Sequence, residues 1–501
     1  MRSDLSPSQR PSVMLTLVNG RAESSEYEFD ERSTCLIGRA EDCSPRLPND
    51  DDHRSVSRHH CMLDINPPNV RIRDFGSRNG TYVNGVKIGQ RDPGQSAAQA
   101  GELRLQERDL RDGDEVRLGR SVSIKVRVTK PELPSRVRLS DLDTTLPPPG
   151  CVKCGREIIG EVDAWAGAEY VCASCRTRPE EVMTLLVSLA RESDRSDLKA
   201  IAEYTLLYEL GRGGMGAVYL AKHRVTGKLV ALKLMLPKVA ANSVSRERFK
   251  REVQLTRMLK HPNVAALYED GFADGAFFFT TEYCEGGSLD RLLHQRGGTL
   301  PPSEAVRYAI DVLDGLEYAH EQGVVHRDLS PSNILLSDTS TGGAANGSEA
   351  APASSSGPGL SPGSDFGRYV AKVGDFGLAK AFDRAGLGGL TRTGATAGKP
   401  WYLARQQVIN FKDVPFAVDV WALAACLYRC LTGAYVRDFP RDVDQWHVIL
   451  YSDAVPIRQR DPKIPAALAD VVDTALREHP QIGFPDASSL RAALLDALIS
   501  L

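Results

Sequence analysis

The sequence predicts a multidomain protein in which an all-β sandwich, a small cysteine-rich ribbon and a two-lobed α+β domain follow one another. Residues 13–130 alternate apolar and polar side chains between Gly, Asn and Asp turns, and this period of two is typical of an antiparallel β-sandwich. Two Cys-x-x-Cys pairs lie within residues 151–175. From residue 204 onward, strand-like segments come first and helical patterns follow, which favours an α+β domain.

Length and composition limit the classes of function. A chain of 501 residues is too long for one hydrophobic core, so several domains are expected. Its net charge of −3 gives no reason to expect nucleic-acid binding. We expect no membrane span, because no apolar run reaches the roughly 20 residues that a bilayer requires. Since the N-terminus lacks an apolar signal-peptide stretch, we expect a cytoplasmic protein.

Composition also sets the segment boundaries. A Pro-rich stretch precedes the ribbon, and a helical pattern at about 180–202 follows it. Residues 337–367 are mostly Ser, Gly, Ala and Pro, so they cannot offset the entropy of ordering and we expect a disordered insertion. The predicted segments are a sandwich at 13–130, a linker at 131–150, a ribbon at 151–176, a helical linker at 177–203 and an α+β domain at 204–495.

Motifs in the last segment point to phosphate chemistry. A glycine-rich stretch at 211–218 follows an apolar strand, and glycines there allow the backbone to approach phosphates closely. The apolar run 230–233 ends in a lysine, residues 326–333 read His-Arg-Asp-Leu-Ser-Pro-Ser-Asn, and residues 375–377 read Asp-Phe-Gly. A lone G-x-G-x-x-G is a weak signal, so the order of the whole series carries the argument.

This series resembles the protein-kinase family over residues 204–495. The resemblance implies a two-lobed protein-kinase fold that transfers phosphate from ATP, with Mg²⁺ or Mn²⁺, to serine or threonine in protein substrates. It implies that Asp328 positions the acceptor hydroxyl and accepts its proton. Glu252 would hold Lys233 against the phosphates, while Asn333 and Asp375 would bind the metal. The residues implied around ATP are Gly211, Gly213, Gly216, Val218, Ala231, Lys233, Thr281, Glu282 and Cys284.

The Asp-Phe-Gly triplet occurs three times, beginning at Asp74, Asp365 and Asp375. Only the third follows an apolar strand-like run, at residues 369–373. Because a strand holds a carboxylate rigidly against a metal, we assign metal binding to Asp375 and regard the other two triplets as coincidences.

Several positions depart from the family pattern. Ser330 stands where serine/threonine kinases have a lysine near the transferred phosphate, and Lys399 stands where they have a threonine. Lys399 either supplies the missing charge from a new position or is merely solvated, and both interpretations stay open. Gln406 and Gly483 stand where the family has a buried glutamate–arginine pair. Losing one partner of such a pair costs about 3–5 kcal/mol, whereas losing both can be nearly neutral.

The segment between the third Asp-Phe-Gly triplet and residue 404 corresponds to the activation segment of kinases. A phosphate on this segment would pair with Arg327, beside the catalytic aspartate, and order the segment. The candidate phosphorylation sites are Thr391, Thr393 and Thr396.

Three ordered blocks in the sandwich carry a second resemblance: Gly38-Arg39, residues 57–60 and residues 74–85. They resemble the forkhead-associated (FHA) domain, a β-sandwich whose loops bind phosphothreonine peptides. The resemblance places four residues on the phosphate, and we expect His60 to brace the loops instead. Implied partners are phosphothreonine-containing peptides or proteins, including the chain's own activation segment. The four phosphopeptide-binding residues are Arg39, Ser57, Arg58 and Asn79.

The ribbon has the spacing of a four-thiolate zinc site. Reduced cytoplasmic thiols in such pairs favour metal binding over disulfides. A redox pair is the alternative, but one pair would suffice and no thioredoxin-like βαβ pattern surrounds these. We expect structural Zn²⁺ without a catalytic role. The predicted ligands are Cys151, Cys154, Cys172 and Cys175.

Together these patterns predict an ATP-dependent serine/threonine protein kinase with a phosphothreonine-reading FHA domain for partner recruitment or autoregulation. The departures at Ser330, Lys399 and Arg405 keep an alternative open, in which the chain is a pseudokinase or a phosphopeptide-binding signalling scaffold.

Overall fold

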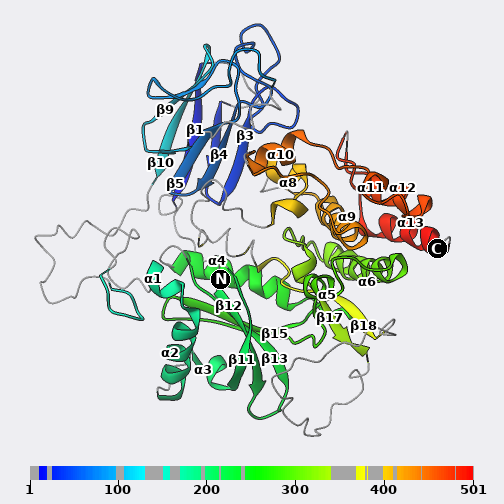
Figure 1. The fold of residues 1–501 in the computed structure, drawn as a ribbon. Helices are drawn as coiled ribbons and strands as arrows, with labels where there is room; N and C mark the ends of the chain where they lie inside the picture. Colours follow the sequence, from blue (N-terminus) through cyan, green and yellow to red (C-terminus); the bar gives the residue numbers. More distant parts are fainter. Residues whose placement is uncertain are drawn as a thin grey trace, which may run out of the picture.

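The computed structural model places three structured regions side by side (Figure 1). All statements about structure below concern the described residues. These are 11–19, 25–96, 107–129, 150–157, 170–192, 198–213, 216–237, 243–339, 368–378, 381, 387, 399–409, 414–441, 443–479 and 481–499.

The N-terminal region is a sandwich of two antiparallel sheets, as predicted. One sheet has the order β2-β1-β10-β9-β6-β7 and the other has the order β3-β4-β5-β8. Inward side chains such as Leu15, Ile37, Leu63 and Ile124 form the core between them. The strands are β1 Ser12–Asn19, β2 Glu26–Phe29, β3 Ser33–Ile37, β4 Cys61–Asn66, β5 Asn69–Asp74, β6 Thr81–Val83, β7 Val86–Gly89, β8 Glu107–Leu110, β9 Glu115–Leu118 and β10 Val122–Thr129.

The cysteine ribbon and the following helices pack on the five-stranded sheet that follows them in the chain. The helices are α1 Ala173–Arg176, α2 Pro179–Glu192 and α3 Lys199–Ala202. The helix expected at about 180–202 is therefore present as α2 and α3, with residues 193–197 outside the described part. Val182, Leu186 and Ile201 share one apolar cluster with Tyr219 and Leu232 of that sheet. This packing makes the ribbon part of the N-lobe.

The N-lobe consists of a five-stranded antiparallel sheet of order β11-β12-β13-β15-β14, together with helix α4. Phe249 of α4 packs against Phe277 of the sheet, with ring centroids 4.4 Å apart. The elements are β11 Tyr204–Gly213, β12 Gly216–His223, β13 Leu229–Met235, α4 Ser243–Arg257, β14 Leu267–Ala273 and β15 Ala276–Glu282.

The C-lobe is mainly helical and is built around α9, whose Trp421 and Tyr428 are fully buried. A small sheet of order β16-β17-β18 lies at the side that faces the N-lobe. The elements are β16 Gly287–Ser288, α5 Leu289–Gln295, α6 Pro302–Glu321, η4 Pro331–Asn333, β17 Ile334–Asp338, β18 Tyr369–Val373, η6 Pro400–Tyr402, α8 Arg405–Ile409, α9 Ala417–Thr432, α10 Gln445–Tyr451, α11 Ile457–Arg460, α12 Ala466–Ala475 and α13 Ala487–Ile499.

The predicted insertion begins later in the structure than the sequence indicates. Ser337 and Asp338, which we assigned to the start of the disordered insertion, belong instead to β17 and pair with Val370 and Tyr369. The rest of that insertion, apart from residue 339, lies outside the described residues. Within the described chain, every helix is too short or too polar to cross a membrane.

Candidate active site

The glycine-rich stretch forms the turn between β11 and β12. An added Cβ at Gly211 or Gly213 would meet no atom within 4 Å, so this part of the turn faces open space. At Gly216, an added Cβ would lie 1.8 Å from the carbonyl oxygen of Leu234, and φ is +150°. Only glycine fits there without moving the backbone. Val218 pairs with Lys233 across the β12–β13 ladder, which fixes the lysine relative to the turn.

Lys233 reaches across to the segment that follows β18. Its Nζ donates to Asp375 Oδ2 at 2.6 Å. Asp375 has a φ of +59°, a left-handed conformation that is uncommon for residues other than glycine and that is often found at functional sites. Glu252 lies on α4 and is partly buried. The implied contact between Glu252 and Lys233 stays a prediction.

One buried carboxylate holds the start of the segment 326–333, here called the catalytic loop. Asp419 of α9 is completely buried and accepts the N–H groups of His326 at 2.7 Å and Arg327 at 2.8 Å. The ring of His320 bonds the same carboxylate at 2.9 Å. Burial alone would raise the pKa of Asp419, but these hydrogen bonds and the histidine hold it below its usual value. They also stabilise Arg327 at its φ of +66°.

Further hydrogen bonds connect this loop to both metal-ligand candidates. Nδ1 of His326 accepts the N–H of Asp328, so its Nε2 carries the proton and donates to the carbonyl of Gly374 at 2.9 Å. Asn333 Nδ2 donates to the carbonyl oxygen of Asp328 at 2.7 Å and to its Oδ2 at 3.3 Å. Asp328 and Asn333 therefore come from one loop, and the charges of Lys233 on β13 and of Asp375 after β18 lie close enough to act on Asp328.

The environment of Asp328 suits a base. Burial in the cleft raises the pKa of its carboxyl group, while His326, Asn333 and Lys233 counteract part of that rise. A carboxylate with a raised pKa is a better proton acceptor than an exposed one.

The predicted adenine-binding segment lies at the end of β15. Thr281 pairs with Ala231 across the β13–β15 ladder. The side chain of Glu282 is occupied by a salt bridge with Lys372 at 2.6 Å. Cys284 is buried, which raises the pKa of its thiol to about 12 and keeps it protonated.

Lys399 lies at the catalytic loop. Its Nζ donates to Ser332 Oγ at 2.8 Å, and Ser332 Oγ lies 3.0 Å from Ser330 Oγ. Ser332 also donates weakly to Asn333 Oδ1 at 3.4 Å. The ammonium group of Lys399 therefore contacts Ser332. Ser332 lies two residues after Ser330, and Ser330 is the position at which other serine/threonine kinases have a lysine.

Gln406 and Gly483 stand where other kinases have a buried glutamate and arginine that pair with each other. This part of the C-lobe nevertheless contains a buried ion pair, which two other residues form. Arg437 and Glu478 are both almost fully buried and are in direct contact. Glu478 also accepts the N–H of Arg405 at 2.6 Å. At Gly483 an added Cβ would lie 1.8 Å from the carbonyl oxygen of Thr474, which explains why no side chain is present there.

Two of the predicted phosphopeptide-binding residues of the sandwich, Arg39 and Asn79, bond the backbone of residues 55–57, which includes a third, Ser57. Arg39 Nε donates to the carbonyl of Val56 at 2.6 Å, and Asn79 Nδ2 donates to the carbonyl of Ser55 at 2.7 Å. Ser57 Oγ accepts the N–H of residue 78 at 2.9 Å. The adjacent Arg58 is exposed to solvent.

His60 braces these loops, as expected. Its Nδ1 accepts the N–H of Ser57 at 2.9 Å and its Nε2 bonds the carbonyl of Gly80 at 3.1 Å. Asp74, in the first Asp-Phe-Gly triplet, is fully buried and accepts hydroxyl groups from Ser77 and Thr81 at 2.5 and 2.6 Å. This carboxylate therefore shapes a loop of the sandwich. The second triplet and Thr391, Thr393 and Thr396 lie outside the described residues.

The four ribbon cysteines form a cluster whose sulfur atoms all lie within 4.8 Å of one another: Cys151, Cys154, Cys172 and Cys175. Sulfurs placed tetrahedrally at a Zn–S distance of about 2.3 Å would be about 3.8 Å apart. The Cys154 and Cys172 sulfurs are 3.8 Å apart. Burial would raise the pKa of Cys151, but neighbouring backbone N–H donors lower it to about 7. The cluster fits a zinc ion.

Sequence reasoning missed three groups that support the site: His320 on the anchoring carboxylate, the Arg437–Glu478 pair, and Gln407, whose side chain donates to the carbonyl of Arg327. Each lies far along the chain from its partner. The sequence has no local signal for such contacts.

Comparisons with known proteins agree with this geometry. The family model of the protein kinase domain matches residues 204–481, and that of the FHA domain matches residues 35–119. Serine/threonine-protein kinase PknD of Mycobacterium tuberculosis is 34% identical over 297 residues, which cover 59% of this chain and 40% of that protein. Tyrosine-protein kinase MasK of Myxococcus xanthus is 31% identical over 313 residues, covering 59% and 43%.

The chain thus spans about two fifths of the length of these relatives. Among solved structures, the kinase domain of Mycobacterium tuberculosis PknI is 25% identical, with 59% of this chain and 96% of that chain covered and a TM-score of 0.42. More than half of this chain is matched by the kinase family model. The chain therefore belongs to the protein kinase family.

Proposed function

We propose that this chain is a protein kinase that transfers the γ-phosphate of Mg-ATP to serine or threonine side chains. The main support is that Lys233 bonds Asp375, Asn333 bonds Asp328, and the charges of Lys233 and Asp375 lie close enough to act on Asp328. Mg²⁺, when bound, neutralises charge on the phosphates. Lys233 binds the α- and β-phosphates, Asn333 and Asp375 hold the metal, and Asp328 orients the acceptor hydroxyl and takes its proton.

We assign Lys399 a role in the same step. Its position on Ser332, beside Ser330, favours the interpretation that it supplies the positive charge that other serine/threonine kinases place at residue 330. A cation there stabilises the charge that develops on the transferred phosphate.

The kinase proposal is tested by phosphate transfer from labelled ATP, comparing wild type with Asp328→Asn and analysing the labelled amino acids. Label on serine or threonine that disappears in the variant supports the proposal. Label on tyrosine would assign a different specificity. No label, with ATP still bound, would favour a pseudokinase that serves as a scaffold.

We propose that the sandwich binds phosphothreonine peptides through Arg39, Ser57, Arg58 and Asn79. Support comes from Arg39 and Asn79, whose side chains both bond the backbone of residues 55–57 next to Ser57 and the exposed Arg58. Binding of a phosphothreonine peptide pool that is lost in Arg39→Ala is the expected result. Equal binding of the unphosphorylated pool would contradict it.

We propose that the four cysteines hold a structural zinc ion, and we place the protein in the cytoplasm, where such thiols stay reduced. Zinc content of one ion per chain, lost in Cys172→Ser, is the expected measurement. A disulfide between two of these cysteines in freshly purified protein would contradict the assignment.

A further inference from the structure

One face of the sandwich is covered by the C-lobe. In β3 and β4 the side chains alternate, so Cys35, Ile37 and Leu63 point into the sandwich core while Leu36 and Met62 point outward. An outward face is normally polar. Here Leu36 and Met62 are buried, because they pack against α8 and α10 of the kinase domain (Figure 1).

The apolar part of the contact is continuous. On the sandwich side it contains Leu36, Met62 and Phe75, and on the C-lobe side it contains Val408 and Ile449, all nearly inaccessible to solvent. Phe75 belongs to the first Asp-Phe-Gly triplet, which we had regarded as a coincidence. Its ring stacks on His447 of α10 with centroids 5.8 Å apart.

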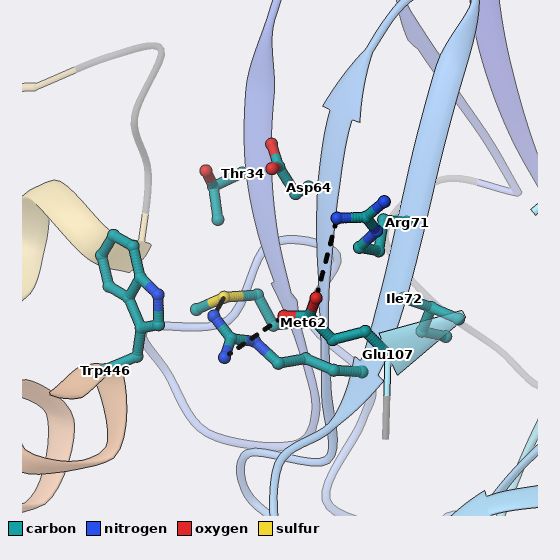
Figure 2. A pocket seen from close by; sticks show the side chains of 8 residues that line it. Thr34, Met62, Asp64, Arg71, Ile72, Glu107 and Trp446 are labelled. Atoms are coloured by element: carbon teal, nitrogen blue, oxygen red, sulfur yellow. Dashed lines mark hydrogen bonds and ion pairs between the residues drawn. The ribbon is translucent and has the colours of Figure 1, made fainter. Parts of the chain in front are cut away.

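Polar contacts fix the position of the sandwich relative to the C-lobe. Arg73 is opposite Met62 in the β4–β5 ladder, and its Nη1 bonds Asp444 Oδ2 at 2.9 Å. Asp444 is the N-cap of α10. Figure 2 shows Trp446 of α10 facing Met62. A cavity of about 20 Å³, enough for one water molecule, is lined by Met62 and Arg73 of the sandwich together with Trp446 of α10.

The same contact includes the loop that carries the phosphate-binding candidates. His59 directly follows Arg58, and its Nδ1 lies 3.1 Å from the hydroxyl of Tyr451 on α10. Its Nε2 lies 2.7 Å from Asp42. The carbonyl of Arg58 accepts the N–H of Ala40 at 3.0 Å, which connects this loop to the segment that carries Arg39. A ligand that moves or orders Arg58 therefore acts on the contact with α10.

On the other side, α8 touches the catalytic loop. Val408 of α8 packs in the interdomain contact, while its neighbour Gln407 donates to the carbonyl of Arg327. The N–H of Arg327 is held by Asp419. Arg327 is therefore fixed from both sides, one residue before Asp328. Gln407 is a positioning residue, since it acts on the catalytic aspartate through Arg327.

We propose that the sandwich docks on α8 and α10 of the kinase domain, and that a phosphothreonine peptide on its loops strengthens this contact and raises kcat. The proposal rests on the reader function proposed above. A coupling free energy of typical size changes an affinity by about 5- to 150-fold, so peptide binding and docking of the sandwich must strengthen each other by the same factor.

The test uses the full chain and a degenerate phosphothreonine peptide pool, with the unphosphorylated pool as control. Peptide binding is followed by fluorescence anisotropy, and kcat and KM for ATP are measured with and without the pool. For wild type we expect kcat to rise at least fivefold with little change in KM for ATP. Arg39→Ala should show neither binding nor activation.

Two variants address the contact itself. Leu36→Lys introduces a charge at an outward position, so the sandwich core is unaffected, and Val18→Lys, at an exposed position of β1, is the matched control. Tyr451→Phe removes only a hydroxyl group. We expect Leu36→Lys and Tyr451→Phe to bind the pool but to lose most of the activation, whereas Val18→Lys behaves like wild type.

The outcomes separate the two proposals. If wild type does not bind the pool, the reader function is wrong, and the coupling falls with it. If wild type binds the pool through Arg39 but kcat changes less than twofold, or if both contact variants keep the full activation, only the coupling is wrong. Gln407→Leu gives an independent reading, because a positioning role predicts lower kcat with unchanged KM for ATP.

Discussion

The substitution Lys399→Met tests how this kinase supplies charge at the transferred phosphate. Methionine keeps most of the length of the side chain and removes only the ammonium group, which lies 2.8 Å from Ser332 Oγ. If Lys399 acts on the phosphate, the variant loses one charge-assisted hydrogen bond in the transition state. Such a bond contributes about 1.5–3 kcal/mol, which corresponds to a kcat about 10- to 150-fold lower.

The assay is steady-state phosphate transfer at saturating ATP, with Lys463→Met, an exposed lysine in the α11–α12 connection, as the matched control. KM for ATP should change little, because Lys233 and the metal ligands are intact. Ser330→Lys in the Lys399→Met background restores a cation at the family position, 3.0 Å from Ser332 in the native chain, and should recover much of kcat. A kcat within twofold of wild type for Lys399→Met would refute the assignment and leave Lys399 as a solvated side chain.

The remaining predictions concern the anchor, the base and the ribbon. Asp419→Ala leaves two buried N–H groups and His320 without their acceptor, so the free energy of unfolding in urea should fall by about 3–5 kcal/mol; a change below 1 kcal/mol would contradict the anchoring role. Because the active form of Asp328 is the carboxylate and burial raises its pKa, kcat should decline on acidification at a pH above the ordinary aspartate value of about 3.9; a decline only below that pH would contradict the assignment. Removal of zinc by a chelator should lower the melting temperature and raise KM for ATP, because Glu180 of α2 bonds Arg212 of the glycine-rich turn at 2.7 Å; unchanged KM would show that the ribbon does not support that turn.

Local patterns selected several residues that the structure brings together at the candidate site. The choice of Asp375 over Asp74 and Asp365 as the metal ligand depended only on the strand that precedes it. In the structure, Asp375 accepts a hydrogen bond from Lys233. Period-two alternation predicted the sandwich because one face of each strand must be buried. The sequence left open whether Lys399 supplies the missing charge or is solvated, because spacing alone does not show where a long flexible side chain points.

The interdomain contact was not predictable in this way. Leu36 and Met62 occupy outward positions, and isolated exposed apolar residues are common on protein surfaces, so neither indicates a partner. Likewise, Arg437 lies between α9 and α10, and Glu478 lies between α12 and α13. These two residues form an ion pair only because the packing of the C-lobe brings the two loops together. Long-range contacts between loops carry no periodicity and therefore no sequence signal.

The most direct test of the account follows phosphate from labelled Mg-ATP into protein, with wild type and Asp328→Asn measured side by side. Both proteins should bind ATP, because Asp328 is assigned to the acceptor hydroxyl and not to the nucleotide. We predict label on serine or threonine of wild type and its loss in the variant. Equal labelling of both proteins, or none in either with ATP bound, would contradict the assignment of Asp328 as the catalytic base.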